Sequence, residues 1–206
     1  MKPTASAGWE RARFIRRFVH HPRTVGAIAP SSRWLAAAMV EPIRHRLQMQ
    51  HGMRIIELGA GTGAFTRAIV AELRVGDRFV SVEIEPEFVA VLRQRWTNVD
   101  FACASAESLE AITSERRFGP ADHIISGLPF ATLPTDTTLR IVQAIGRTLR
   151  PGGTFTTFHY LHSYSVPKAR AFRRQMGQLL SSTPERQSVA WNFPPAVALT
   201  WTDHRQ

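Results

Sequence analysis

The feature that most constrains this chain is a regular alternation of short strand-like runs and longer helix-like runs over residues 53–180. The strand-like runs are apolar or alternate polar with apolar residues, whereas the helix-like runs repeat apolar residues every three or four positions. The predicted strands are 53–58, 78–83, 99–102, 122–126 and 154–158. The predicted helices are 62–74, one that begins at Pro86, 106–112, 136–149 and 168–180. Such alternation predicts an α/β fold, in which helices cover both faces of a parallel sheet.

Two further strand-like runs, 188–191 and 197–201, lie near the C-terminus. The segment between them contains Asn192-Phe193-Pro194-Pro195, which favours a turn, so we predict an antiparallel pair. We also expect Pro151-Gly152-Gly153 to end the helix over 136–149 before the fifth strand begins. The expected sheet therefore has seven strands, mostly parallel, with an antiparallel strand at the C-terminus.

The composition is that of one globular domain, since 44% of the 206 residues are hydrophobic and 20% are charged. A chain of this length buries enough apolar surface to fold without covalent links. The single cysteine, Cys103, excludes an internal disulfide and a cysteine metal cluster, and we expect no metal site. No apolar run reaches the roughly 18 residues of a spanning helix, and the charged N-terminus is unlike a signal peptide. We therefore expect a cytoplasmic protein that is a monomer in solution.

The net charge of +10 is concentrated towards the two ends of the chain. Residues 1–50 hold nine Lys or Arg and two acids, and residues 137–206 hold the same numbers, whereas residues 51–136 hold eight and twelve. All of the basic residues except Lys2 and Lys168 are arginines, which suit bidentate contacts with phosphate. This asymmetry predicts attraction to a polyanion, either a nucleic acid or an anionic membrane.

The strongest local motif is Glu57-Leu58-Gly59-Ala60-Gly61-Thr62-Gly63, between the first predicted strand and the helix that follows it. Glycines there allow a tight turn and a close approach of the backbone to a ligand at the carboxyl edge of the sheet. Glu83 ends the next strand, where an acid can accept hydrogen bonds from both ribose hydroxyls of an adenosine. The glycines alone also fit a dinucleotide site or a turn without a ligand. Glu57 disfavours a dinucleotide, because a carboxylate repels pyrophosphate and attracts the ammonium group of a methionine moiety.

The first fifty residues are predicted to contain an amphipathic helix over 9–19. The apolar side chains on one arc of its helical wheel are those of Ala12, Phe14, Ile15, Phe18 and Val19. Arg13, Arg16 and Arg17 lie on the opposite arc, and Arg11 is on the apolar side. A helix lying in a lipid interface has this pattern, and so does a helix docked on a protein core. The charge of residues 1–50 favours the lipid interface.

Five segments spread over nearly the whole chain carry a family resemblance. They are RTVGAIAPSS (23–32), ELGAGTGAFTRAIV (57–70), EIEPEF (83–88), SGLPF (126–130) and WNFPPA (191–196). Together they resemble the bacterial phospholipid N-methyltransferases, which are class I S-adenosylmethionine-dependent methyltransferases. The resemblance implies a Rossmann-like seven-stranded fold, S-adenosylmethionine as cofactor with S-adenosylhomocysteine as product, and successive methylation of phosphatidylethanolamine towards phosphatidylcholine.

The same resemblance implies a division of labour along the chain. Residues 1–50 are expected to form a membrane-binding helix and a cover for the active site, with Ser31 or Ser32 capping a helix that begins near Pro30. Residues 51–206 are expected to form the methyltransferase domain. The implied partners are phosphatidylethanolamine and anionic lipids at the inner face of the cytoplasmic membrane, and no nucleic acid.

The resemblance also implies a cofactor site at the carboxyl edge of the sheet. Its expected members are Ala29, Ser31, Glu57, Gly59, Ala60, Gly61, Thr62, Glu83, Ile84, Ser105, Ala106, Glu107 and Ser126. Ala104-Ser105 stands where relatives commonly have Gly-Asp. The adenine contact is therefore expected to move to the backbone of Ala106 or to Glu107.

Methyl transfer to an amine requires that the ammonium lose a proton and that the lone pair be aligned with the methyl group. Tyr160 is the best candidate catalytic residue, because its hydroxyl can orient the amine and aromatic faces attract methylated ammonium groups. Phe130 and Phe158 are further aromatic candidates, each equally consistent with a place in the core. His159 or His162 is a candidate proton relay.

Two other functions are consistent with part of this pattern. Ribosomal RNA adenine N6-dimethyltransferases share the cofactor loop, a basic surface and a strand-end motif resembling Asn-Leu-Pro-Tyr, whose amide can hold a flipped base. Here Ser126-Gly127 precedes Leu128-Pro129-Phe130, so that amide is missing. A membrane-binding module with a degenerate nucleotide fold is disfavoured by the intact set of Glu57, Gly59, Gly61 and Glu83.

Overall fold

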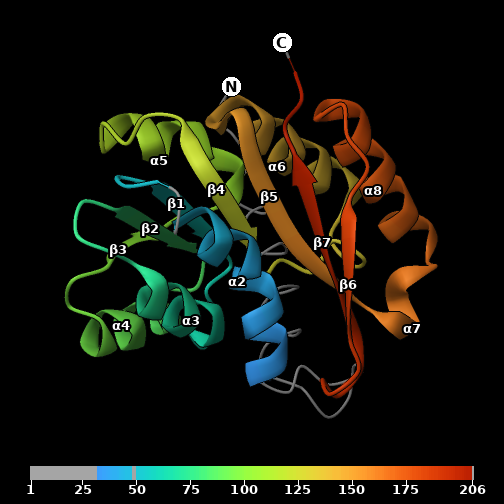
Figure 1. Cartoon of the computed structure of the whole chain (residues 1–206), viewed down its shortest axis with the longest axis horizontal. Helices are drawn as coiled ribbons and strands as arrows, with labels where there is room; N and C mark the ends of the chain where they lie inside the picture. The colour runs from blue at the N-terminus through green and yellow to red at the C-terminus, as the bar shows by residue number, and fades with distance from the viewer. Residues whose placement is uncertain (1–31, 48–49, 206) are drawn as a thin grey trace, which may run out of the picture.

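The computed structural model describes residues 32–47 and 50–205, so the predictions for the helix over 9–19, Ala29 and Ser31 lie outside the described residues. Seven strands form one sheet in the order β3-β2-β1-β4-β5-β7-β6 (Figure 1). They are β1 (Arg54–Leu58), β2 (Arg78–Glu83), β3 (Asp100–Cys103), β4 (Ala121–Ser126), β5 (Leu149–Tyr160), β6 (Glu185–Val189) and β7 (Ala196–Thr202). Strands β1 to β5 are parallel, and β7 is antiparallel to both β5 and β6. The predicted mostly parallel sheet with an antiparallel C-terminal strand is confirmed.

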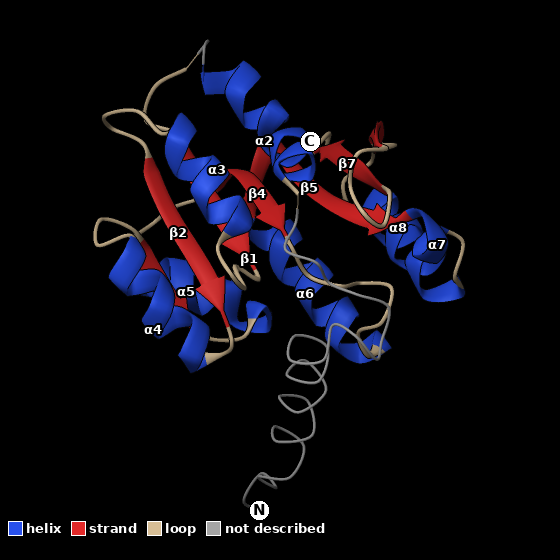
Figure 2. Ribbon diagram, turned by 90° about the horizontal axis from the view of Figure 1, so that it is seen from below, coloured by secondary structure: helices blue, strands red, loops and turns tan. Residues whose placement is uncertain are grey.

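Helices cover both faces of this sheet. They are α2 (Arg33–Leu47), α3 (Ala64–Glu72), α4 (Pro86–Arg95), the 3₁₀ turn η1 (Ala106–Ser108), α5 (Leu109–Glu115), α6 (Thr135–Thr148), α7 (Leu161–Tyr164) and α8 (Pro167–Leu179). Apolar residues of α2 and α3 pack in one core, and those of α5, α6 and α8 pack in another. Seen from below, α2 and α3 lie on one side of the strands and α6 on the other (Figure 2). Among the helices of the described segments, none is both long and apolar enough to cross a bilayer.

Two boundaries near the C-terminus differ from the predictions. Pro151-Gly152-Gly153 does not separate a helix from a strand, because α6 ends at Thr148 and β5 already begins at Leu149. The end of β7 holds this segment in the sheet: the Gly152 amide donates to the Asp203 carbonyl, and the Asp203 amide donates to the Gly153 carbonyl, both at 2.8 Å. The predicted strand 188–191 is displaced to Glu185–Val189, which leaves Trp191 in the turn before β7. The first difference arises from pairing with a segment about fifty residues away, and the second from the register of β6 with the neighbouring β7.

The carboxyl ends of β1, β2, β4 and β5 meet at one edge of the sheet, which we call the carboxyl edge. The turn between β6 and β7 reaches the same edge, because Ala196 at the start of β7 pairs with Tyr160 at the end of β5. Helix α2 also begins there, since the Ser32 amide donates to Asn192 Oδ1 at 3.1 Å. Ser32 Oγ accepts a hydrogen bond from the Leu35 amide at 3.2 Å, so the cap predicted at Ser31 or Ser32 is confirmed at Ser32.

Candidate functional site

The loop over residues 59–63, the glycine loop, connects β1 to α3 at the carboxyl edge. Gly59, Gly61 and Gly63 have φ angles of +76°, +52° and +83°, a region that other residues rarely adopt. A Cβ atom at Gly59 would lie 2.8 Å from the Leu128 side chain, and one at Gly63 would lie 2.7 Å from the Trp96 ring, so a larger residue at either position would displace a neighbouring side chain. A Cβ atom at Gly61 would meet no atom of the described residues within 4 Å. Gly61 is therefore the glycine that faces open space, where a ligand fits.

Glu83 lies next to the glycine loop at the end of β2. Its Oε2 atom accepts a hydrogen bond from the Gly61 amide at 2.8 Å. Its Oε1 atom accepts hydrogen bonds from the amides of Ile84 at 2.8 Å and Glu85 at 3.0 Å. These three bonds fix the carboxylate at the carboxyl edge, so the structure brings together the glycine loop and the acid that the sequence singled out.

Glu57 is fully buried at the start of this loop. Its Oε2 atom accepts hydrogen bonds from Thr66 Oγ1 at 2.7 Å and Ser81 Oγ at 2.6 Å, whereas Oε1 has no partner within the described segments. Burial raises the pKa of this carboxyl to about 7, and the two hydroxyl groups oppose that rise. An acceptor buried without a donor is costly, so the site fits a ligand that brings a donor such as an ammonium group. The methionine end of S-adenosylmethionine carries one.

The segment after β3 supplies the candidate adenine contacts. The Ala104 amide donates to the Glu83 carbonyl at 3.0 Å, which places this segment beside Glu83. Ser105 Oγ accepts a hydrogen bond from the Glu107 amide at 3.2 Å and caps η1. The Glu107 carboxylate forms an ion pair with Arg140 of α6, and Ala106 is buried. Because the side chains of Ser105 and Glu107 already have partners and Ala106 is buried, the backbone of this segment is the candidate for contacting adenine.

Three other predicted cofactor residues have varied surroundings. Ala60 is buried in a small core with Phe101, whereas Thr62 is exposed in the glycine loop. Ser126 is buried at the end of β4, and its hydroxyl accepts a hydrogen bond from the Leu128 amide at 3.2 Å. All three lie at the carboxyl edge, but side-chain contact with a ligand is open only to Thr62 without rearrangement.

An aromatic wall, formed by Phe65, Phe158 and Tyr160, extends from the glycine loop along the carboxyl edge. A Cβ atom on Gly127 would lie 2.8 Å from the Gly59 carbonyl oxygen and 3.3 Å from the Phe65 ring, so the three residues are in close contact. The ring centroids of Phe65 and Phe158 are 5.8 Å apart, and those of Phe158 and Tyr160 are 5.2 Å apart. Burial raises the pKa of Tyr160 above its usual value, so its hydroxyl keeps its proton at neutral pH.

The two candidate catalytic residues, Tyr160 and His159, are not brought together, because adjacent residues of a strand point to opposite faces. His159 is buried on the face that carries α8, with its ring centroid 5.7 Å from that of Phe172. Burial lowers its pKa to about 4. The ring of His162 instead stacks on Tyr160, with centroids 5.6 Å apart.

Phe130, which the sequence left between site and core, belongs to the core. Its ring stacks on Phe172 with centroids 4.0 Å apart, and its side chain is buried. Sequence reasoning missed the roles of Phe65, Thr66 and Ser81. The role of Ser81 could have been suspected from the sequence, because a hydroxyl residue interrupts an otherwise apolar strand interior. The structure pairs Ser81 in register with Glu57.

Comparisons with known proteins agree with this geometry. Residues 55–153 match a family model described as a methyltransferase domain. The chain is 30% identical over 145 residues to an ornithine lipid N-methyltransferase of Singulisphaera acidiphila, an alignment that covers 69% of this chain and 73% of that protein.

Two solved structures share the fold at low sequence identity. The N-methyltransferase NodS from Bradyrhizobium japonicum WM9, in complex with S-adenosyl-L-homocysteine, is 15% identical with a TM-score of 0.65, over 95% of this chain and 98% of that one. The 1,6-didemethyltoxoflavin-N1-methyltransferase of Burkholderia thailandensis, with bound S-adenosylhomocysteine, is 20% identical with a TM-score of 0.63. The alignment covers 100% of this chain and 93% of that one.

Proposed function

Because this chain belongs to the class I S-adenosylmethionine-dependent methyltransferases, we propose that it N-methylates the amine of a lipid head group, with phosphatidylethanolamine as the substrate. The observation that carries the proposal is the aromatic wall beside the glycine loop. Phe65 is buried, whereas Phe158 and Tyr160 are half-buried at the end of β5, and in this proposal the accessible parts of those two rings meet the cation. Methylated ammonium groups keep their charge and lose hydrogen-bond donors, so ring faces suit each successive product. The similarity to a lipid N-methyltransferase supports a lipid amine in particular.

S-adenosylmethionine, when bound, supplies an electrophilic methyl group on its sulfonium sulfur. The chain offers it three fixed elements: Glu57 Oε1, which no described residue pairs, for the ammonium group, the Glu83 carboxylate for the ribose hydroxyls, and the backbone at Gly61. Each of these is held by hydrogen bonds or by packing before any ligand binds. Preorganisation of this kind aligns reacting groups without a further entropic cost.

The side chains at the end of β5 act on the amine. The Tyr160 hydroxyl oxygen orients the head-group ammonium by accepting a hydrogen bond from one of its N–H groups, and the Phe158 ring packs beside the Tyr160 ring. The exposed His162 ring, stacked on Tyr160, is placed to take the released proton and pass it to solvent. His159 points to the other face and therefore has no part in this scheme.

Membrane association belongs to the same proposal. The predicted helix over 9–19 and the basic side chains of α8 are the groups that would bind an anionic surface at the inner face of the cytoplasmic membrane, with the protein a monomer in solution. Lys168 and Arg170 are exposed, whereas Arg173 lies 3.9 Å from the Tyr164 ring centroid and donates to the Tyr164 carbonyl. Lys168 Nζ donates to the Leu133 carbonyl at 3.2 Å, so the exposed Arg170 and Arg174 are the side chains of α8 best placed to meet phosphate.

The test is transfer of labelled methyl groups to four separate acceptors. They are vesicles that contain phosphatidylethanolamine, vesicles that contain an ornithine lipid, phosphatidylcholine vesicles as a blank, and ribosomal RNA. We expect label in phosphatidylethanolamine. Ornithine lipid is the second candidate, because the relative described above carries that name. Label in RNA alone would overturn the proposal and favour the adenine dimethyltransferase alternative.

A further inference from the structure

The turn between β6 and β7 exposes two large aromatic side chains. Trp191 and Phe193 are 83% and 86% exposed in residues 190–195, which we call the aromatic turn. Trp34 in the first turn of α2 and Leu161 at the start of α7 are 48% and 52% exposed. Figure 1 shows the β6–β7 turn, the start of α2 and α7 along the same lower side of the molecule. Exposed apolar groups gathered in one region indicate an interaction surface.

The aromatic turn is held firmly to the rest of the carboxyl edge. Asn192, between the two exposed rings, is buried, and its Nδ2 donates to the Pro194 carbonyl at 2.7 Å. Its Oδ1 accepts a hydrogen bond from the Ser32 amide, and the Pro195 carbonyl accepts one from the Leu161 amide at 2.9 Å. The turn, α2 and α7 are therefore linked by hydrogen bonds. Asn192 is thus buried between two exposed rings in a backbone that these hydrogen bonds hold in place.

Exposed basic side chains occur in α2, which carries Trp34, and in α8, which follows α7. Arg33 is exposed, and its guanidinium lies 4.7 Å from the Trp34 ring centroid. Lys168 and Arg170 are exposed in the first turn of α8, directly after α7. No acidic residue occurs in residues 137–184, which include β5, α7 and α8. Rings with a polar atom and cationic side chains are the combination that suits the head-group region of an anionic bilayer.

We propose that the aromatic turn, together with Trp34 and Leu161, inserts into the interfacial layer of an anionic lipid bilayer. The inference deepens the proposed function, on which its statement about substrate entry rests. Tyr160 pairs with Ala196, the residue that follows the turn, so the membrane contact and the aromatic wall are adjacent on one edge of the sheet. A lipid amine could then reach Tyr160 while the acyl chains stay in the bilayer.

The first test measures binding without turnover, by flotation with vesicles of phosphatidylcholine and phosphatidylglycerol. The double variant Trp191→Ser, Phe193→Ser should lose about tenfold or more in vesicle affinity, because two rings no longer leave water. The matched control is Val75→Ser, since Val75 is 99% exposed in the turn between α3 and β2, far from the carboxyl edge. Its affinity should equal that of the wild type. Unchanged binding of the double variant would overturn the inference and assign membrane binding to other residues, such as Arg13, Arg16 and Arg17.

The second test separates membrane insertion from substrate contact. Trp191→Phe should bind vesicles normally but show less of the fluorescence quenching that brominated lipids cause in the wild type, with the remaining quenching coming from Trp34. On a short-chain phosphatidylethanolamine dissolved as monomers, the Trp191→Ser, Phe193→Ser variant should turn over like the wild type. An equal loss on monomers and vesicles would overturn the inference, because it would show that the rings contact the substrate. If the wild type methylates no lipid but its vesicle binding still depends on the aromatic turn, the proposed function is wrong and the insertion of the aromatic turn into the bilayer is supported.

Discussion

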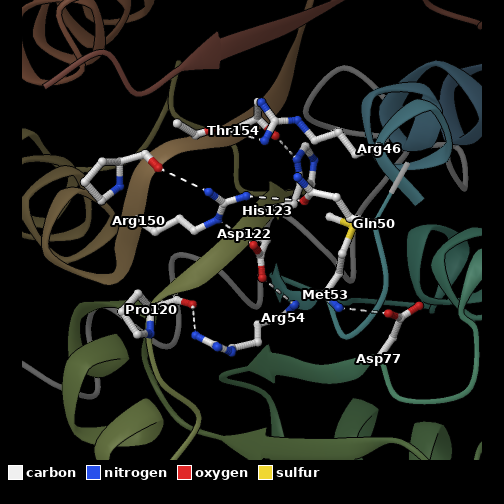
Figure 3. Close-up of polar contacts among 12 residues, drawn as sticks. Arg46, Gln50, Met53, Arg54, Asp77, Pro120, Asp122, His123, Arg150 and Thr154 are labelled. Atoms are coloured by element: carbon white, nitrogen blue, oxygen red, sulfur yellow. Dashed lines mark hydrogen bonds and ion pairs between the residues drawn. The ribbon is translucent and has the colours of Figure 1, made fainter. Parts of the chain in front are cut away.

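The two edges of the sheet differ in how their polar groups are paired. We call the opposite edge, where the parallel strands begin, the amino edge. There Asp122 accepts a hydrogen bond from the Arg54 amide at 2.8 Å and forms an ion pair with Arg150 (Figure 3). Arg46 donates to the Gly152 carbonyl at 2.7 Å, and the Met53 amide donates to Asp77 Oδ1 at 2.8 Å. At the carboxyl edge, Glu57 Oε1 lacks a donor within the described residues. The charged side chains at the amino edge are thus paired internally, although the buried His123 Nε2 has no partner among the described residues, whereas the unpartnered atom at the carboxyl edge belongs to a carboxyl group beside the glycine loop.

Two buried titratable groups show the same contrast. His123 at the amino edge bonds to Thr154 Oγ1, and burial lowers its pKa to about 3, so the ring is neutral at physiological pH. Burial raises the pKa of Glu57 to about 7, so this carboxyl changes charge close to physiological pH. Burial thus keeps His123 neutral throughout the physiological pH range, whereas it brings the pKa of Glu57 into that range. Four predictions follow this contrast, in order of decreasing effect.

Gly61→Val should reduce affinity for S-adenosylhomocysteine by about 100-fold or more, because a branched side chain would fill the space that a ligand needs. Isothermal titration calorimetry measures this affinity. Gly76→Val is the matched control: Gly76 has a φ of +96° and also has no atom within 4 Å of an added Cβ, but it lies in the turn before β2. Both variants carry a strain of about 1–2 kcal/mol. Equal affinities in the two variants would contradict the placement of the ligand.

Asp122→Asn should lower the free energy of unfolding by about 2 kcal/mol, because Arg150 loses its charged partner in a half-buried site. Urea denaturation at neutral pH measures this change. Affinity for S-adenosylhomocysteine should stay within about twofold of the wild type, since the substitution lies at the amino edge. A large loss of ligand affinity with unchanged stability would reverse the roles that we assign to the two edges.

Glu57→Gln should remove a pH dependence of ligand binding. With a pKa of about 7, the ionised fraction of Glu57, and with it the affinity of the wild type for S-adenosylhomocysteine, should rise about tenfold from about pH 6 to about pH 8. The variant should bind weakly and without this rise.

The stability of the wild type should change in the opposite direction. The folded-state pKa of Glu57 is raised, so the native state binds more protons than the unfolded state, and the free energy of unfolding falls as pH rises from about 4.5 to about 7. Glu57→Gln should lack that contribution in thermal melts. If the affinity of the wild type for S-adenosylhomocysteine did not change between about pH 6 and about pH 8, the role that we assign to the Glu57 carboxylate would be wrong.

Tyr160→Phe should lower turnover about fivefold on the first methylation and less on the last, because the first amine has the most hydrogens to direct. Rates at saturating lipid for unmethylated, monomethylated and dimethylated head groups measure the difference. Tyr164→Phe is the control, since this other tyrosine packs beside His159 on the opposite face. Identical rates for Tyr160→Phe and the wild type at every step would remove the hydroxyl from the mechanism.

Much of the fold was predictable from local patterns. The strands that became β1, β2 and β4 were placed to within a residue or two, because a buried parallel strand is a short apolar run between turn signals. The cofactor loop and Glu83 were also predictable, since glycines with positive φ and an acid at a strand end are local requirements. The site was predicted less completely. Phe65 and Thr66 belong to it because α3 places them against Phe158 and Glu57, contacts that no local pattern indicates.

The sequence by itself determined the alternation of strands and helices, the glycine loop and the opposite orientations of His159 and Tyr160, because each depends on neighbours along the chain. Tertiary structure alone decided that Phe130 stacks on Phe172 in the core and that Pro151-Gly152-Gly153 lies within a strand held by Asp203. It also decided that Asn192 turns inwards to meet Ser32, leaving Trp191 and Phe193 in water. These outcomes depend on partners more than twenty residues away in sequence, whose positions no local periodicity specifies.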